Sequence, residues 1–169
     1  MRPLDRRRAG RAALFAALLA VCASCDHGTK QLAESRLASG ESVTCCAGAV
    51  RLELAHNPGA LLSVGAGLAP ALRGGVFVLL TPIALALFGV LAARAGLASG
   101  SALAGLGLVA GGGLGNWVDR LLHEGAVTDF VSIGFGRMRT GIFNVADVCI
   151  VVGVAILLIA TTLRAEARC

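Results

Sequence analysis

The sequence predicts an all-α membrane protein with four transmembrane helices and a small β element on one face. Of the 169 residues, 56% are hydrophobic and 15% are charged, and the mean hydropathy of +0.80 is far above that of a soluble domain. The apolar residues also form long uncharged runs, and a helix needs about 20 such residues to cross roughly 30 Å of hydrocarbon. Because no repeat or low-complexity linker divides the chain, we expect residues 1–169 to form a single domain.

The first helix is expected over about residues 12–38, although its uncharged part, from Ala12 to Cys25, is short. A cleaved signal peptide is the alternative interpretation of residues 1–25, because the chain starts with many arginines and the apolar run has the length of a signal-peptide core. Nothing after Cys25 is typical of a secreted domain, and the helical pattern continues through Asp26. We therefore expect an uncleaved first helix.

The other three helices follow from three further uncharged runs. Arg94 separates the second helix, expected over about residues 73–93, from the third, expected over about residues 97–117. The fourth is expected over about residues 145–163 and contains one acid, Asp147. Such an acid within a membrane span requires a functional explanation.

Glycine is concentrated in the third predicted helix. Gly107, Gly111 and Gly115 are four residues apart, and Gly112 and Gly113 lie between them. This spacing lets transmembrane helices approach closely, whereas a phosphate-binding loop would need a preceding strand in a soluble βαβ unit. We therefore predict helix packing here and no nucleotide site.

Five arginines in the first eleven residues place the N-terminus in the cytoplasm by the positive-inside rule. The connections at about residues 39–70 and 118–143 then form two loops on the outer face. The first contains the alternating segment Val50 to Leu54, which predicts short strands, and the second is expected to be part loop and part strand. The net charge of +5 fits anchoring to anionic lipid headgroups, so membrane lipids are expected partners and nucleic acid is not.

The cysteines and histidines do not predict a metal or redox centre. Cys22 and Cys25 form a C-x-x-C pattern, but within an apolar helix and not in the βαβ setting of redox motifs. The three histidines lack metal-ligand spacing, so we expect neither a metal nor another cofactor. Whether Cys45 and Cys46 oxidise is left open.

The aspartates are the chemically informative residues. Four of the five in the chain are brought to the outer face by topology alone, namely Asp26, Asp119, Asp129 and Asp147. Burying such groups in a membrane protein costs several kcal/mol, roughly, and usually marks function. Two aspartates close together share a proton and can activate water, which hydrolyses a peptide bond without a covalent intermediate. A proton or ion carrier and a non-catalytic scaffold protein are the alternatives.

Several other polar residues are spaced to support these acids. Lys30, the only lysine, is four residues after Asp26 and shares its helix face. Asn116 and Asn144 each stand three residues before an acid and can orient it. Arg120 can pair with one of the acids or with a lipid phosphate.

Five segments, in order, resemble the motifs of the lipoprotein signal peptidase (signal peptidase II) family of bacterial membrane aspartyl peptidases. They are DHGTK at 26–30, HNPGALLS at 56–63, GGGLGNWVDR at 111–120, VTDF at 127–130 and FNVAD at 143–147. The sequence departs from the family pattern at His27, at Pro58 and in a slightly long spacing between Arg120 and Asp129.

The resemblance implies four transmembrane helices with both termini in the cytoplasm, a β-cradle formed by the first outer loop, and a catalytic dyad of Asp129 and Asp147. The residues it implies for shaping the site or holding substrate are Asp26, Lys30, Asn57, Gly59, Asn116, Asp119, Arg120, Asn144 and Ala146. It also implies a multi-pass enzyme of the bacterial inner membrane, expected to be a monomer, with its site at the outer face. The implied substrate is a diacylglyceryl-modified prolipoprotein, cleaved before the lipidated cysteine.

Overall fold

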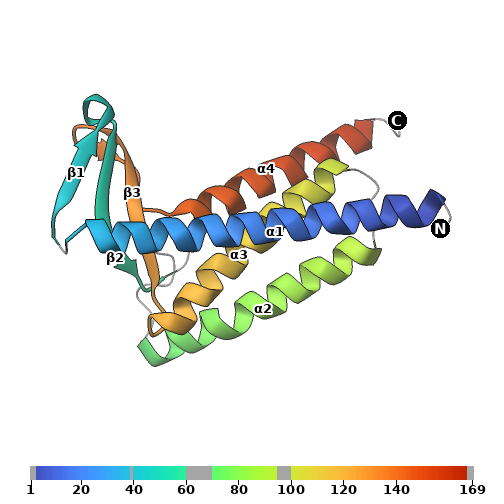
Figure 1. Ribbon diagram of the computed structural model, residues 1–169, viewed down its shortest axis with the longest axis horizontal. Helices are drawn as coiled ribbons and strands as arrows, with labels where there is room; N and C mark the ends of the chain where they lie inside the picture. The colour runs from blue at the N-terminus through green and yellow to red at the C-terminus, as the bar shows by residue number, and fades with distance from the viewer. Residues whose placement is uncertain (1–2, 39, 60–69, 95–99, 167–169) are drawn as a thin grey trace.

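A computed structural model describes residues 3–38, 40–59, 70–94 and 100–166. Four helices run roughly side by side, and a sheet closes one end of them, while the N- and C-termini both lie at the other end (Figure 1). The helices are α1 (Pro3–Arg36), α2 (Pro70–Arg94), α3 (Gly100–Leu122) and α4 (Val145–Glu166). The strands are β1 (Ser42–Cys45), β2 (Val50–Asn57), β3 (Val127–Phe135) and β4 (Met138–Arg139), with a short 3-10 turn η1 (Cys46–Gly48) between the first two.

The four helices confirm the predicted helical part of the fold class. Two of the described helices are long and apolar enough to cross a membrane, Ala9–Arg36 with a mean hydropathy of 1.5 and Val145–Leu163 with 2.5. α2 contains a shorter apolar stretch, Gly75–Leu87. Large apolar side chains point outward along α2 and α4, as expected of surfaces that face lipid rather than water. They include Leu79, Leu80, Ile83, Leu87, Val151, Val154, Leu158 and Ile159.

α3 is the central helix and packs against each of the other three. Its glycines make this possible. A Cβ at Gly111 would lie 2.7 Å from the Cβ of Cys22 and 2.9 Å from the carbonyl oxygen of Leu19 on α1, and a Cβ at Gly112 would collide with the carbonyl oxygen of Ala146 on α4. The glycine spacing therefore serves close helix packing, as the sequence predicts.

α3 also ends later than expected. The predicted boundary near residue 117 rested on the first charged residue after the apolar run, but the helix continues through Asp119 and Arg120 to Leu122. Both charged side chains are buried, at 3% and 7% exposure. Polar partners from other elements stabilise both side chains inside the protein, so the helix continues past the first charged residue.

The sheet is antiparallel with strand order β1-β2-β3-β4. β1 and β2 come from the first predicted outer loop and β3 and β4 from the second, so both loops contribute to one sheet. β2 pairs with β3 so that Ala55 lies opposite Asp129, after an irregularity between Leu52 and Ala55. The remainder of the first predicted loop, residues 60–69, and the predicted start of the third helix at residue 97 lie outside the described residues.

A small apolar cluster fixes the sheet to the helices. Ala33 and Leu37 from the end of α1 pack with Phe130 of β3, and partly buried residues of β2 surround them. This contact fixes the start of β3, where Asp129 lies, against the C-terminal end of α1.

Replacing Gly111 by Ala should weaken α1–α3 packing. The new methyl group would meet a backbone oxygen and a Cβ at under 3 Å, and overpacking of this kind costs about 1–3 kcal/mol. We expect a lower thermal unfolding temperature for the purified protein in detergent.

Gly113→Ala is the matched control, because its nearest neighbour is the flexible end of Leu85 at 3.1 Å. This variant should match the parent protein or gain slightly from the better helix propensity of Ala. Equal unfolding temperatures for the two variants would contradict the packing role of Gly111.

Candidate active site

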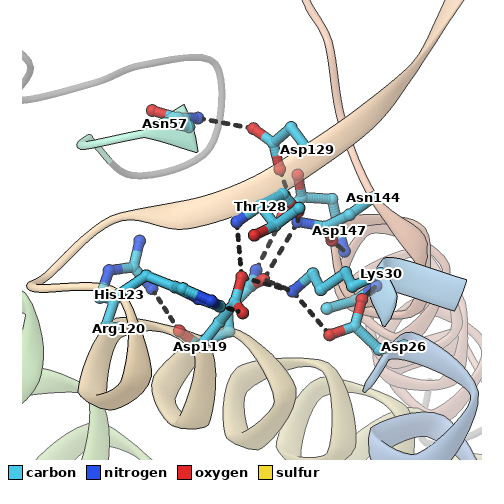
Figure 2. Close-up of polar contacts among 12 residues, drawn as sticks. Asp26, Lys30, Asn57, Asp119, Arg120, His123, Thr128, Asp129, Asn144 and Asp147 are labelled. Atoms are coloured by element: carbon cyan, nitrogen blue, oxygen red, sulfur yellow. Dashed lines mark hydrogen bonds and ion pairs between the residues drawn. The ribbon is translucent and has the colours of Figure 1, made fainter. Parts of the chain in front are cut away.

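Charged and amide side chains from four elements meet where the helices join the sheet (Figure 2). Asp26 and Lys30 come from α1, Asn116, Asp119 and Arg120 from α3, and Asp129 from β3, while Asp147 lies in the first turn of α4 and Asn144 directly before it. Each of these eight side chains is buried. The structure therefore brings together all four aspartates that topology assigned to one face.

Lys30 is the centre of the charged part of this site. Its Nζ donates to Asp26 Oδ2 at 2.7 Å and lies 3.3 Å from Asp119 Oδ2, with both side chains of each pair almost fully buried. It also donates to Asn116 Oδ1 at 3.0 Å. The predicted Asp26–Lys30 pair is thus present, and the same ammonium group also joins α1 to α3.

Asp26 additionally fixes the beginning of α4. Its Oδ1 accepts a hydrogen bond from the backbone N–H of Ala146 at 2.9 Å. An acid is favourable there, because the first N–H groups of a helix lack partners within the helix and carry partial positive charge. Ala146 is fully buried, so its contribution is a backbone contact and a small side chain that lets α3 approach.

Two asparagines hold the acid of α4. Asn144 precedes the helix and accepts the N–H of Asp147 at 2.9 Å, which is the usual side-chain cap of a helix N-terminus. Asn116 donates to Asp147 Oδ1 at 2.9 Å. The spacing had suggested that Asn116 orients Asp119; it contacts Asp147 instead, because the close approach of α3 and α4 brings the neighbouring helix within reach.

Asp129 faces the same site from the sheet. Its two carboxylate oxygens accept hydrogen bonds from the amides of Asn144, at 2.6 Å, and Asn57, at 2.9 Å. Burial raises the pKa of the Asp129 carboxyl to about 6, and the negative charge of Asp147 acts in the same direction. The amide donors oppose this shift because they stabilise the ionised form. The pKa of the Asp129 carboxyl is therefore raised from its ordinary value toward neutral pH.

The Asn57–Gly59 segment connects the sheet to Arg120. Asn57 Oδ1 accepts the backbone N–H of Gly59 at 2.9 Å, closing a tight turn, and the carbonyl of Gly59 accepts a hydrogen bond from Arg120 at 2.8 Å. Arg120 lies 5.2 Å from the ring centroid of Phe77 on α2. Arg120 is therefore buried in the protein interior, where its guanidinium binds the backbone carbonyls of Asn116 and Gly59.

Two hollows adjoin the acids. A polar cavity of about 10 Å³, roughly the room that one water needs, is lined by Asn57, Gly59, Asn116, Arg120, Val127, Asp129 and Asp147. Asp147 also borders a larger apolar hollow of about 240 Å³, together with Phe143, Val148, Val151 and Val152. Asp147 thus stands between a polar chamber and an apolar one.

Three further residues of the site were not singled out from the sequence. Thr128 is fully buried and donates to Glu34, and Glu34 in turn lies near His123. Only His123 carried a local indication, since it is four residues after Asp119 on the same helical face. Among the described residues, no group of three His, Cys, Asp or Glu side chains is arranged to hold a metal ion. The thiols of Cys45 and Cys46 are free and exposed.

Comparison with known proteins identifies relatives over most of the chain. The family model described as signal peptidase (SPase) II matches residues 18–163. The lipoprotein signal peptidase of Rhodococcus jostii (strain RHA1) is 36% identical over 159 residues, which cover 90% of this chain and 74% of that one. The corresponding protein of Gloeobacter violaceus is 37% identical over 154 residues, covering 91% and 83%.

The fold is also known from solved structures. A bacterial membrane enzyme determined by the in meso method at 2.3 Å resolution superposes with a TM-score of 0.78 and 22% identity, covering 92% of this chain and 91% of that one. A second, at 1.9 Å, gives a TM-score of 0.70 with 23% identity, covering 87% and 91%. The likeness covers both the helices and the sheet, so the arrangement in Figure 1 is that of a known membrane fold.

Lys30→Met should destabilise the protein strongly. The substitution keeps the length of the side chain but leaves Asp26 and Asp119 buried without their cation, and breaking a buried ion pair costs about 3–5 kcal/mol. Thermal unfolding in detergent measures the loss. Arg51→Gln removes a cation from a pair with Glu53 that is 40% and 24% exposed, and it should cost under about 1 kcal/mol. Similar losses for both variants would argue against a special role for Lys30.

Proposed function

Since the chain belongs to the lipoprotein signal peptidase (signal peptidase II) family of membrane aspartic peptidases, we propose that Asp129 and Asp147 are its catalytic dyad. The observation that carries the proposal is the polar cavity, which both aspartates line and which has about the volume of one water. The raised pKa of Asp129 supports it further, because a dyad of this kind must keep one proton near neutral pH.

The chemistry follows from the arrangement of donors. One aspartate, ionised, removes a proton from the water, and the other, protonated, donates a hydrogen bond to the carbonyl oxygen of the scissile peptide. Water attacks the carbonyl carbon to give a tetrahedral intermediate, and transfer of a proton to the leaving nitrogen completes the hydrolysis. Asn57 and Asn144 hold Asp129 in place, and Asn116 holds Asp147. No covalent enzyme intermediate is required.

The substrate is a prolipoprotein carrying a diacylglyceryl group on the cysteine after its signal peptide, and cleavage occurs before that cysteine. The apolar hollow beside Asp147 supports a lipid-modified substrate, because an apolar surface lies directly next to a carboxylate. This surface is formed by Phe143, Val148, Val151 and Val152. A lipid-modified peptide needs this combination of an apolar wall and a hydrolytic group. The sheet would cover the scissile bond from the outer side.

In the membrane, all four helices span the bilayer, with the sheet and the dyad at the outer face and both termini in the cytoplasm. α2 and α3 have 25 and 23 residues, or about 37 and 34 Å at about 1.5 Å per residue, enough to cross. The arginine-rich N-terminus and the position of both termini opposite the sheet in Figure 1 support this orientation. The proposed location is the bacterial inner membrane, and the proposed oligomeric state is a monomer.

An ion carrier would require polar groups along the full thickness of the bilayer. Among the described residues, the buried charged side chains are Asp26, Lys30, Asp119, Arg120, Asp129 and Asp147, and all of them lie at the sheet end. A scaffold protein would have no need for two acids around a water-sized chamber. The arrangement therefore favours the peptidase over both alternatives.

Asp129→Asn and Asp147→Asn should each lower the cleavage rate of a diacylglyceryl-modified prolipoprotein by at least about 100-fold, because a neutral amide can neither accept the proton of water nor share one. Mass spectrometry of the product with purified enzyme in detergent measures both the rate and the cleavage position. Asp5→Asn, the same substitution at the start of α1 and far along the helix from the sheet, is the control. Undiminished cleavage by either site variant would sink the assignment of the dyad.

Asn57→Ala should move the alkaline limb of the activity profile to higher pH. The lost hydrogen bond stabilises the ionised carboxylate, so its removal raises the pKa of Asp129 further above about 6, and the dyad keeps its proton to higher pH. The expected displacement is about one pH unit. Glu53→Gln on the same strand serves as control, and a limb that stays in place or moves to lower pH in Asn57→Ala would contradict the role of Asn57.

A further inference from the structure

A second polar cluster, Glu34, His123 and Asp119, lies beside the dyad but outside the water-sized cavity. Nδ1 of His123 lies 2.9 Å from Asp119 Oδ1, and Nε2 faces Glu34 Oε1 at 3.8 Å. An ionised carboxylate can only accept, so the ring donates the N–H of Nδ1 to Asp119, whereas the 3.8 Å separation of Nε2 from Glu34 is too long for a hydrogen bond. The cluster joins the end of α3 to the last turns of α1 at the boundary with solvent, since the side chains of Glu34 and His123 are both about one third exposed (34%).

This cluster, together with Asn144, binds every polar group of one residue, Thr128. The backbone N–H of Thr128 donates to Asp119 Oδ2 at 2.5 Å, and its Oγ1 donates to Glu34 Oε1 at 2.9 Å. Its carbonyl accepts a hydrogen bond from Asn144 at 3.3 Å. All three polar groups of Thr128 are therefore bound to side chains of α1, of α3 and of the residue that caps α4. Figure 2 shows Thr128 between Asp119 and Asp129.

Thr128 directly precedes Asp129 on β3, so whatever fixes its backbone also fixes the position from which the Asp129 side chain starts. Asp119 takes part in two networks, since one oxygen accepts from Thr128 and lies near Lys30 while the other faces His123. His56, opposite Thr128 on β2, places its ring 6.1 Å from the ring of His123 and closes the cluster on the sheet side.

We propose that Glu34 and His123 are positioning residues for the hydrolytic step, and this rests on the dyad proposed above. They hold Asp119 and Thr128 in place and thereby set the distance of Asp129 from Asp147 and from the water between them. Neither residue lines the polar cavity or the apolar hollow. They act on the rate of the chemical step and leave substrate binding unchanged.

Variants on either side of the cluster test the proposal. His123→Leu removes the side chain that donates a hydrogen bond to Asp119. Thr128→Val keeps the size of the side chain but removes the hydroxyl that donates a hydrogen bond to Glu34. Each should lower kcat by about 10-fold or more with KM within about twofold, because small displacements of a reacting group are costly. His123→Gln and Thr128→Ser, which restore a donor at the same position, should recover most of the rate.

Two comparisons make the test specific. Glu124→Gln removes an exposed acid from the residue next to His123 and should leave kcat and KM unchanged. Glu34→Ala combined with Thr128→Val should be no slower than the slower single variant, because both remove the same hydrogen bond.

The proposal is overturned if His123→Leu and Thr128→Val keep the parent kcat, if KM rises while kcat is unchanged, or if the conservative variants restore nothing. Where His123→Leu does not fold, Thr128→Val and its Ser counterpart decide between these results. Asp129→Asn, measured in the same assay, separates the two levels of the argument. Full activity of Asp129→Asn would contradict the proposed dyad itself. If Asp129→Asn is inactive but the cluster variants keep the parent rate, only the positioning role is contradicted.

Discussion

The burial of Lys30 is the interaction on which the rest of the site depends. Its single ammonium group contacts Asp26, Asn116 and Asp119, and in doing so joins α1 to α3. Without it, two carboxylates would lie in the protein interior uncompensated, which costs several kcal/mol, roughly. With it, Asp26 is held where it can accept the N–H of Ala146, and the start of α4 is fixed. The helix that carries Asp147 is thus positioned through a chain of contacts that begins at Lys30.

The site also depends on the glycines of α3, because a charge network of this density requires helix backbones that lie close together. A Cβ at Gly115 would lie 2.7 Å from Asp26 Oδ2, and one at Gly112 would collide with the carbonyl of Ala146. The same positions that permit packing therefore also make room for the acids. This explains why Asn116, one residue after Gly115, reaches Asp147 on the neighbouring helix rather than Asp119 on its own.

The sequence predicted those features that depend on local patterns. Uncharged runs predicted the four helices, and topology brought the four aspartates to one end, where the structure has them. The choice of Asp129 and Asp147 within that group came from the motif resemblance alone, since charge placement treats all four alike. Features that depend on partners distant in sequence were not predictable: the continuation of α3 through Asp119 and Arg120, and the contact of Glu34 with Thr128, separated by 94 residues.

The charge balance of the site has a chemical consequence. Four buried aspartates, Asp26, Asp119, Asp129 and Asp147, face only two buried cations among the described residues, Lys30 and Arg120. Lys30 lies closest to Asp26 and Asp119, so its positive charge mainly compensates these two acids. The charge of Arg120 is then the buried positive charge that remains for Asp129 and Asp147. Two under-compensated carboxylates around one small chamber favour the binding of a proton between them. A substrate that covers the chamber and excludes water strengthens this preference, because ionised groups then lose solvation as well. The helix packing and the ion pairs thus favour the shared proton that the proposed dyad requires.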